Sequence, residues 1–79
     1  MEAKEVIIYS TPTCPYCKMA KQFFADNNIS FTDFDVSNDM AKQQEMIGKS
    51  NQLAVPVIDV GGEVVVGFNE PKLRELLGL

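Results

Sequence analysis

The sequence of 79 residues contains no histidine, no tryptophan and only two cysteines, Cys14 and Cys17. Zinc sites use four ligands, mostly Cys and His, so one copy of this chain is not expected to hold zinc, and only a dimer sharing both cysteines could do so. Basic residues are also few, with seven Lys and Arg against eleven Asp and Glu and a net charge of −4. Scattered lysines in an acidic chain are not expected to bind nucleic acid or an anionic membrane surface.

Long apolar runs are missing as well. No uninterrupted apolar run exceeds four residues, whereas a membrane-spanning helix needs about 20. Residues 1–5 carry charges of both signs and lead directly into an apolar segment, a pattern unlike that of a secretory signal, so we expect a cytoplasmic protein. Because 79 residues are too few to enclose two hydrophobic cores, we also expect a single domain over residues 1–79, and a monomer.

Apolar periodicity and turn residues predict secondary structure in the order β-α-β-α-β-β-α. The expected strands span 6–9, 29–36, 55–60 and 63–66, and the expected helices span 15 to about 26, about 40 to 49 and about 70 to 77. A strand, a crossover helix and a further strand pair in parallel, and the Gly61-Gly62 turn makes an antiparallel hairpin of the last two strands. The sequence therefore predicts an α/β fold with a four-stranded mixed sheet and helices on both faces.

The two cysteines lie three residues apart at the expected start of the first helix, which opens with Pro15. This spacing lets them form a reversible disulfide. At the positive end of the helix dipole the pKa of Cys14 is expected to fall to about 3.5–7.5 from about 8.5, with Lys18 and Lys21 adding positive charge. Cys17, one turn deeper and facing the core, is expected to keep a higher pKa. We therefore expect Cys14 to attack and Cys17 to resolve the mixed disulfide.

Two other readings of the cysteine pair stay open at this point. Free cysteines are often buried and inert, although Cys14 follows a polar loop at a helix N-terminus, where reactive thiols are found. A dimer could also bind metal through both cysteines. Pro15 is expected to tune the redox couple, because it removes one backbone donor near the sulfur and its fixed φ stiffens the turn.

Across nearly the whole chain, the sequence resembles the glutaredoxins. The resemblance rests on Cys-Pro-Tyr-Cys at 14–17, on residues 41–47, on Ala-Val-Pro at 54–56 and on Gly67-Phe68 ahead of the last helix. It implies the thioredoxin fold, a cis proline at Pro56 beside the active site, and disulfide reduction without a bound cofactor. Glutathione is then the expected reductant or co-substrate, and proteins with disulfides are the expected substrates.

The resemblance also implies which residues bind and support. Val55 is expected to offer its backbone to glutathione or an extended substrate, as an added strand would pair, and the loop before the last helix is expected to bind a carboxylate. The residues expected to bind glutathione or substrate are Thr11, Tyr16, Gln52, Val55, Pro56, Gly67, Phe68 and Asn69. The residues expected to support the cysteines are Pro15, Tyr16, Lys18 and Pro56.

Two departures from the glutaredoxin pattern leave the electron donor open. Thr11 stands where glutaredoxins usually carry a lysine, and Asn69-Glu70 replaces an acidic pair. Gly67-Phe68 resembles instead the small redoxins that serve ribonucleotide reductase and are reduced by thioredoxin reductase. Lys18, Lys49 or Gln52 are expected to compensate in part for the missing lysine. A third alternative is a dimer that shares an iron–sulfur cluster through Cys14, against which Pro15 and Tyr16 argue.

Overall fold

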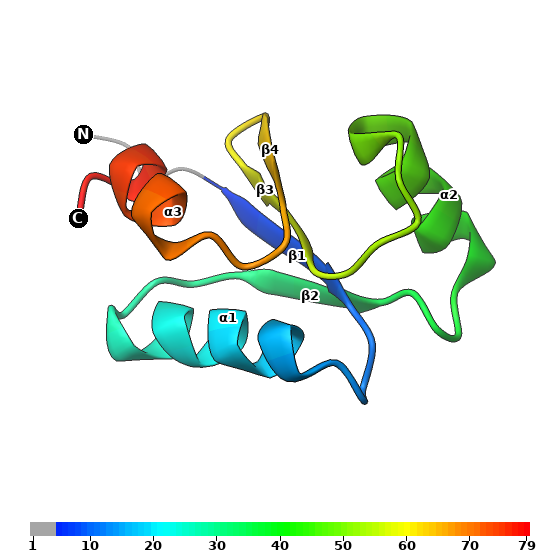
Figure 1. Cartoon of the computed structure of the whole chain (residues 1–79), viewed down its shortest axis with the longest axis horizontal. Helices are drawn as coiled ribbons and strands as arrows, with labels where there is room; N and C mark the ends of the chain where they lie inside the picture. Colours follow the sequence, from blue (N-terminus) through cyan, green and yellow to red (C-terminus); the bar gives the residue numbers. More distant parts are fainter. Residues whose placement is uncertain (1–4) are drawn as a thin grey trace.

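The computed structural model describes residues 5–79. Its elements are β1 (Val6–Ser10), α1 (Pro15–Asp26), β2 (Thr32–Asp35), α2 (Met40–Ser50), β3 (Val57–Val60), β4 (Glu63–Val66) and α3 (Glu70–Leu77). Figure 1 shows the strands running between α2 on one side and α1 and α3 on the other. The predicted order of elements is therefore confirmed.

The sheet has the strand order β2-β1-β3-β4. β1 pairs with β2 in parallel and with β3 antiparallel, and β3 pairs with β4 antiparallel. This mixed sheet, with its crossover through α1, is the arrangement expected for the thioredoxin fold. Gly61 and Gly62 form the predicted hairpin turn, with φ of 58° and 100°, values that favour glycine.

Each face of the sheet carries its own apolar cluster. The cluster under α1 and α3 centres on Ile8, Phe24, Ile58 and Leu73, all fully buried. The cluster under α2 is smaller and consists of Tyr9, Val36, Met46 and Val57, with partly buried neighbours. Each fully buried side chain of this kind stabilises the fold by about 1.5–3 kcal/mol, so both helix layers are held mainly by apolar burial.

Two predicted strands are shorter than the sequence suggested. The strand expected over 29–36 covers only Thr32–Asp35, because Ile29 and Phe31 pack against the core from the connecting loop. The strand expected over 55–60 begins at Val57, since Pro56 has no N–H to donate to a neighbouring strand. Within residues 5–79 the helices have at most 12 residues, and none is long and apolar enough to cross a bilayer.

Candidate active site

Cys14 is placed by the junction of β1 and α1. β1 ends at Ser10, and Cys14 follows as the N-cap of α1 in an extended conformation, with Pro15 at the first helical position. The Cys14 Sγ accepts a hydrogen bond from the Cys17 backbone N–H at 3.2 Å. A sulfur at the N-cap thus takes the role that a serine or aspartate oxygen has at other helix starts, and the helix dipole favours negative charge on it.

The two thiols differ in accessibility. Cys14 is partly exposed, Cys17 is fully buried, and neither forms a disulfide in this structure. Burial raises the pKa of Cys17 from its ordinary 9.0 to about 12, and a hydrogen bond with Cys14 adds to this effect. The Thr11 backbone and the charge of Lys21 act to lower the pKa. The thiol that a substrate can reach is therefore Cys14, with Cys17 in reserve one turn behind.

A second segment, distant in the sequence, meets the thiols from the opposite side. The Val55–Pro56 peptide bond is cis, as the resemblance implies, and Pro56 is fully buried. The Cys14 Sγ lies 3.9 Å from the Val55 carbonyl oxygen, within reach of a weak thiol hydrogen bond. A third segment joins through Gly67, whose N–H donates to the Pro56 carbonyl at 2.7 Å. The structure thus places Val55 beside Cys14, and Gly67 beside the adjoining Pro56.

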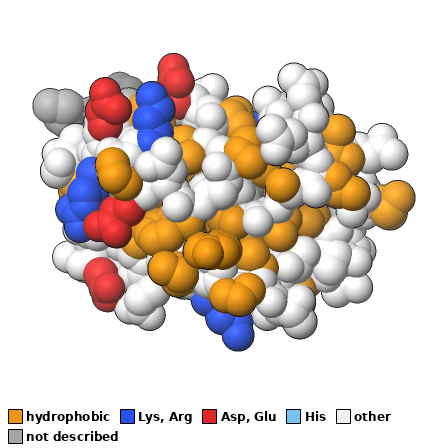
Figure 2. Space-filling view, in the orientation of Figure 1, with side chains coloured by type: hydrophobic (Ala, Val, Ile, Leu, Met, Phe, Trp, Pro, Cys, Tyr) orange, Lys and Arg blue, Asp and Glu red, His pale blue; other side chains and the backbone are white. Residues whose placement is uncertain are grey.

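Apolar side chains are exposed near these segments. Tyr16, Met19 and Leu53 are 61%, 50% and 69% exposed, and all three lie within a few residues of a thiol or of Val55. Figure 2 shows apolar side chains gathered across the middle of one face of the molecule. A surface of this kind can receive apolar groups of a docked chain.

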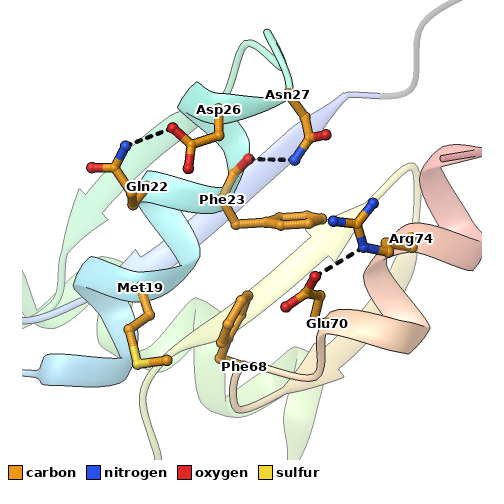
Figure 3. Close-up of a pocket in the computed structure, with 8 residues that line it drawn as sticks. All are labelled: Met19, Gln22, Phe23, Asp26, Asn27, Phe68, Glu70 and Arg74. Atoms are coloured by element: carbon orange, nitrogen blue, oxygen red, sulfur yellow. Dashed lines mark hydrogen bonds and ion pairs between the residues drawn. The ribbon is translucent and has the colours of Figure 1, made fainter.

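A groove runs between α1 and α3 and has a volume of about 440 Å³. Its lining consists of Met19, Gln22, Phe23, Asp26, Asn27, Phe68, Glu70 and Arg74 (Figure 3). Phe68 packs edge-on against Phe23, with ring centroids 5.8 Å apart, and Arg74 lies over the Phe23 ring while pairing with Glu70 at 2.9 Å. These contacts fix Phe68, and with it the loop that follows Gly67.

The other residues expected to bind glutathione or substrate differ in their contacts and exposure. The Asn69 side chain caps α3 by accepting from the Lys72 N–H at 3.3 Å, while Lys18 and Gln52 are exposed. Lys49, also expected to compensate for the missing lysine, has its ammonium group 2.7 Å from the Asp59 carboxylate on the α2 side of the sheet. Of the suggested substitutes, Lys18 and Gln52 stay exposed to a ligand.

A polar cluster that was not expected from the sequence joins β1 and β2 to α1 at Lys21, one helical turn beyond Cys17. The Ser10 hydroxyl, 1% exposed, donates to Asp33 Oδ1 at 2.6 Å, and Asp33 Oδ2 pairs with the Lys21 ammonium at 2.7 Å. One signal was available: Asp33 and Asp35 alternate within a short strand, which places both carboxylates on one face. Their facing partners could not be known before the strand register, which pairs Ile8 with Asp33.

Within residues 5–79 there is no group of three or more His, Cys, Asp or Glu side chains that could hold a metal ion.

Comparison with protein families matches residues 6–65 to the glutaredoxin family. A glutaredoxin-like 8.6 kDa protein encoded in the rubredoxin operon of Clostridium pasteurianum is 46% identical over 70 residues, which are 89% of this chain and 93% of that protein.

Two further relatives agree with this match. Glutaredoxin 3 of Escherichia coli K12 is 34% identical over 65 residues, 82% of this chain and 78% of that protein. The crystal structure of the thioredoxin-like protein BC3987 is 34% identical and superposes with a TM-score of 0.87, over 92% of this chain and 100% of the other. The site described above therefore lies in a fold and a sequence context shared with known redox proteins.

Proposed function

The chain belongs to the glutaredoxin family, and we propose that it is a thiol–disulfide oxidoreductase that reduces protein disulfides and glutathione mixed disulfides through Cys14 and Cys17. The observation that carries the proposal is the asymmetry of the two thiols. Cys14 is accessible and accepts a backbone hydrogen bond at a helix N-terminus, whereas Cys17 is sealed behind it with a raised pKa. Two thiols with this division suit a nucleophile and a resolving group.

In the first step, the Cys14 thiolate attacks one sulfur of the substrate disulfide. A bond forms between Cys14 Sγ and that sulfur, the substrate S–S bond breaks, and the electron pair leaves on the second substrate sulfur, which takes up a proton. The Cys17 N–H, 3.2 Å from Cys14 Sγ, stabilises the attacking thiolate without having to move. The mixed disulfide that results joins the substrate to Cys14.

In the second step, Cys17 loses its proton and attacks Cys14 Sγ. The bond between Cys14 and the substrate breaks, the substrate leaves as a thiol, and Cys14 and Cys17 are left as a disulfide that an external donor must reduce. Cys17 sits one helical turn from Cys14 and already contacts it through its N–H, so the attack needs little rearrangement. Glutathione can replace Cys17 in this step when the substrate is a glutathione mixed disulfide.

Substrate binding is proposed to use the Val55 backbone and the loop at Gly67. Val55 lies outside β3, and its carbonyl faces the Cys14 sulfur, so an extended substrate chain can pair with it while presenting a sulfur to Cys14. Gly67 and Phe68 are held in place by Pro56 and Phe23, respectively. Asn69 presents the N-terminus of α3, which favours a carboxylate, as expected for the γ-glutamyl group.

Two electron donors are proposed for reducing the Cys14–Cys17 disulfide. Glutathione is supported by family membership. A reductase of the thioredoxin reductase type is supported by Thr11 at the place of the family's lysine and by the engagement of Lys49 with Asp59, which together remove charged contacts to glutathione. Each lost charged contact weakens binding by about 1.5–3 kcal/mol, or roughly tenfold or more.

The function is tested with cysteine variants and a protein disulfide as substrate. Cys14→Ser is expected to abolish disulfide reduction, because no accessible thiol remains. Cys17→Ser is expected to accumulate the mixed disulfide, visible by mass spectrometry, while deglutathionylation by glutathione continues. Circular dichroism checks that both variants fold. The role assignment is overturned if Cys17→Ser removes all activity and Cys14→Ser keeps it.

The donor is tested in two parallel assays with one disulfide substrate, one supplied with glutathione and glutathione reductase and the other with thioredoxin reductase and NADPH. Thr11→Lys sharpens the comparison, because it restores the family's cation three residues before Cys14. We expect Thr11→Lys to raise the glutathione-coupled rate about tenfold while the reductase-coupled rate stays within twofold. A wild-type rate already high with glutathione, and unchanged by Thr11→Lys, would mean that the lysine contact is not the missing element.

A further inference from the structure

A polar cluster ties β1 and β2 to α1 one helical turn beyond the buried thiol. Asp33 on β2 uses both carboxylate oxygens: Oδ1 accepts from the Ser10 hydroxyl at 2.6 Å, and Oδ2 pairs with the Lys21 ammonium at 2.7 Å. Ser10 is 1% exposed, so its hydroxyl has exchanged water for this single carboxylate. Asp33 thus joins the end of β1 and the second turn of α1 to β2.

Of the two partners of Asp33, Lys21 lies on the helix face of Cys17, and Ser10 precedes Thr11. Lys21 follows Cys17 by four residues in α1, so the two side chains lie one above the other on one face of the helix. Thr11 directly follows Ser10, and its backbone is one of the groups that act on the Cys17 thiol. The Thr11 backbone and the Lys21 charge are the two influences that lower the pKa of Cys17 against its burial.

We propose that Asp33 is a positioning residue for the second step of exchange, holding the Lys21 ammonium and the Thr11 backbone beside Cys17 so that its sulfur can carry negative charge when it attacks Cys14. The proposal rests on the proposed function, because only a protein that forms a mixed disulfide needs a resolving thiolate. In the first step Cys17 stays protonated, and the Lys21 ammonium, which was expected to act on Cys14, is paired with Asp33, so the cluster is expected to affect that step less than the second.

The surroundings of Cys17 explain why this cluster matters. Cys17 is fully buried, which makes a charged sulfur costly. The charged or titratable groups that act on Cys17 are Cys14 and Lys21 from α1, and Lys21 is in turn paired with Asp33 and acts on Asp35, both from β2. Asp35 is occupied by hydrogen bonds from Ser37, which leaves the pair of Lys21 and Asp33 to set the local charge.

The ion pair with Asp33 also fixes the position of the Lys21 ammonium group. Unpaired, a flexible lysine side chain extends into water, and its effect on a buried sulfur is screened. Paired with Asp33, the Lys21 ammonium is kept against the sheet beside the helix face that carries Cys17. Asp33 itself is a like charge to the thiolate, so its benefit depends on the lysine and hydroxyl that it holds. Removing Lys21 while keeping Asp33 is therefore expected to harm resolution more than removing the Asp33 charge.

The test separates the two steps by time. Reduced protein is mixed with one equivalent of 5,5′-dithiobis(2-nitrobenzoate) in a stopped-flow instrument: attack by Cys14 releases the first chromophore, and resolution by Cys17 releases the second. For Lys21→Met we expect the second phase to slow by about three- to tenfold, since a smaller thiolate fraction is partly offset by a more nucleophilic sulfur. The first phase is expected to slow less than the second, because Cys14 keeps the hydrogen bond from the Cys17 N–H and its place at the N-terminus of α1. Asp33→Asn is expected to slow the second phase less, and Lys21→Arg to restore it to within twofold of wild type.

Two controls separate this role from a loss of fold or of net charge. Lys72→Met removes one positive charge from the exposed surface of α3 and is expected to change neither phase. The pH profile of the second phase adds a readout that a merely structural role would not move: its rate rises with pH as Cys17 ionises, and Lys21→Met is expected to reach a given rate only at higher pH. If Lys21→Met does not fold, Asp33→Asn carries the test.

The outcomes also distinguish this inference from the proposed function. If the wild-type protein releases no chromophore in either phase, thiol exchange itself fails. If the wild-type protein shows both phases, while Lys21→Met and Asp33→Asn alter both phases equally or neither of them, Asp33 is only a structural residue and the inference is overturned.

Discussion

The two faces of the sheet each carry a lysine–aspartate pair that ties a helix to a strand, and the two pairs differ in their surroundings. On the α1 face, Lys21 and Asp33 meet at 2.7 Å with side chains 31% and 34% exposed. On the α2 face, Lys49 and Asp59 meet at the same distance, but the Asp59 side chain is only 12% exposed. The two ion pairs thus have the same length, but Asp33 is more exposed to water than Asp59.

The pair under α2 belongs to a wider network. Tyr9, fully buried, donates its hydroxyl hydrogen to Glu45, and the Lys49 ammonium lies 5.2 Å from the centre of the Tyr9 ring. Asp59 Oδ1 also accepts from the Gly62 N–H at 2.8 Å, so the network reaches the hairpin turn. Burial lowers the pKa of Lys49, but hydrogen bonds to Asp59 and Tyr9 outweigh this and raise it.

The role of each lysine–aspartate pair is therefore decided by the neighbouring groups and not by the ion pair itself. Under α2 every partner is another structural group, so the network fixes the helix and the turn. Under α1 the cation lies beside a thiol that must ionise, so the same pair influences chemistry. Three experiments test this division, beginning with the largest expected effect.

Asp59→Ala is expected to destabilise the protein most. It removes the nearer carboxylate partner of the partly buried Lys49 ammonium, which keeps only Glu45 at 3.8 Å, and it leaves the Gly62 N–H without its acceptor. We expect a loss of about 3 kcal/mol in the free energy of unfolding, at the lower end for broken buried pairs because Lys49 is 29% exposed. In a chain of this size, about 1 kcal/mol lowers Tm by roughly 4–8 °C, so thermal and urea unfolding both measure the effect.

Asp59→Asn is the matched control, because it keeps the acceptor for Gly62 and removes only the charge. It is expected to cost less than Asp59→Ala, and both variants are expected to keep the wild-type ratio of the two chromophore-release rates. A loss below about 1 kcal/mol for Asp59→Ala, as for an exposed pair, would contradict the structural role of the α2 network.

Alkaline pH is expected to weaken the α1 face before the α2 face. The pKa of Cys17 is about 12 in the folded protein, above its ordinary 9.0, so the unfolded chain gives up a proton that the folded chain keeps. Stability from this group is fully present below pH 9 and is lost as the pH rises towards 12, by at most about 1.4 kcal/mol per pH unit. Burial and the hydrogen bond to Glu45 raise the pKa of Tyr9 above 10.0, so its share starts at higher pH.

Urea unfolding of the reduced protein at several pH values checks this order. Cys17→Ser is expected to flatten the loss of stability between about pH 9 and 10, whereas Tyr9→Phe is expected to flatten it only above about pH 10. Equal slopes for Cys17→Ser and wild type over the lower window would show that burial does not hold the Cys17 proton in the folded state.

Most of the architecture could be predicted from local signals. The Cys14-Pro15 start of α1 and the Gly61-Gly62 turn are decided by cap and turn chemistry, which depends on neighbours in the sequence. The strand over 29–36 was drawn too long, because Phe31 reads as a strand residue in sequence yet packs onto the core from a loop. Periodicity alone does not separate these two ways of burying an aromatic ring.

The active site divides along the same line. Cys14, Cys17 and Val55 could be found because their spacing and motifs are local or shared with a known family. The roles of Asp33 and Lys49 depend on register and on helix packing, which bring together residues 10 to 23 positions apart, so no pattern in the sequence could assign their partners. Asp33 reads in sequence as an ordinary surface charge, and Lys49 was expected to help bind glutathione, whereas its ammonium is paired with Asp59.

Asp33→Asn is expected to change the stability of the protein least, and it distinguishes the roles of the two ion pairs most clearly. Its pair with Lys21 is about one third exposed, and such pairs contribute about 0–1 kcal/mol, while the amide can still accept from the Ser10 hydroxyl. We therefore expect the free energy of unfolding to fall by less than about 1 kcal/mol, against about 3 kcal/mol for Asp59→Ala. For the rate of exchange the larger effect is expected from Asp33→Asn, because only this variant slows the second phase of chromophore release. Urea unfolding and stopped-flow traces on the same two samples decide it, and a cost for Asp33→Asn equal to that of Asp59→Ala would mean that both faces use their ion pairs in the same structural way.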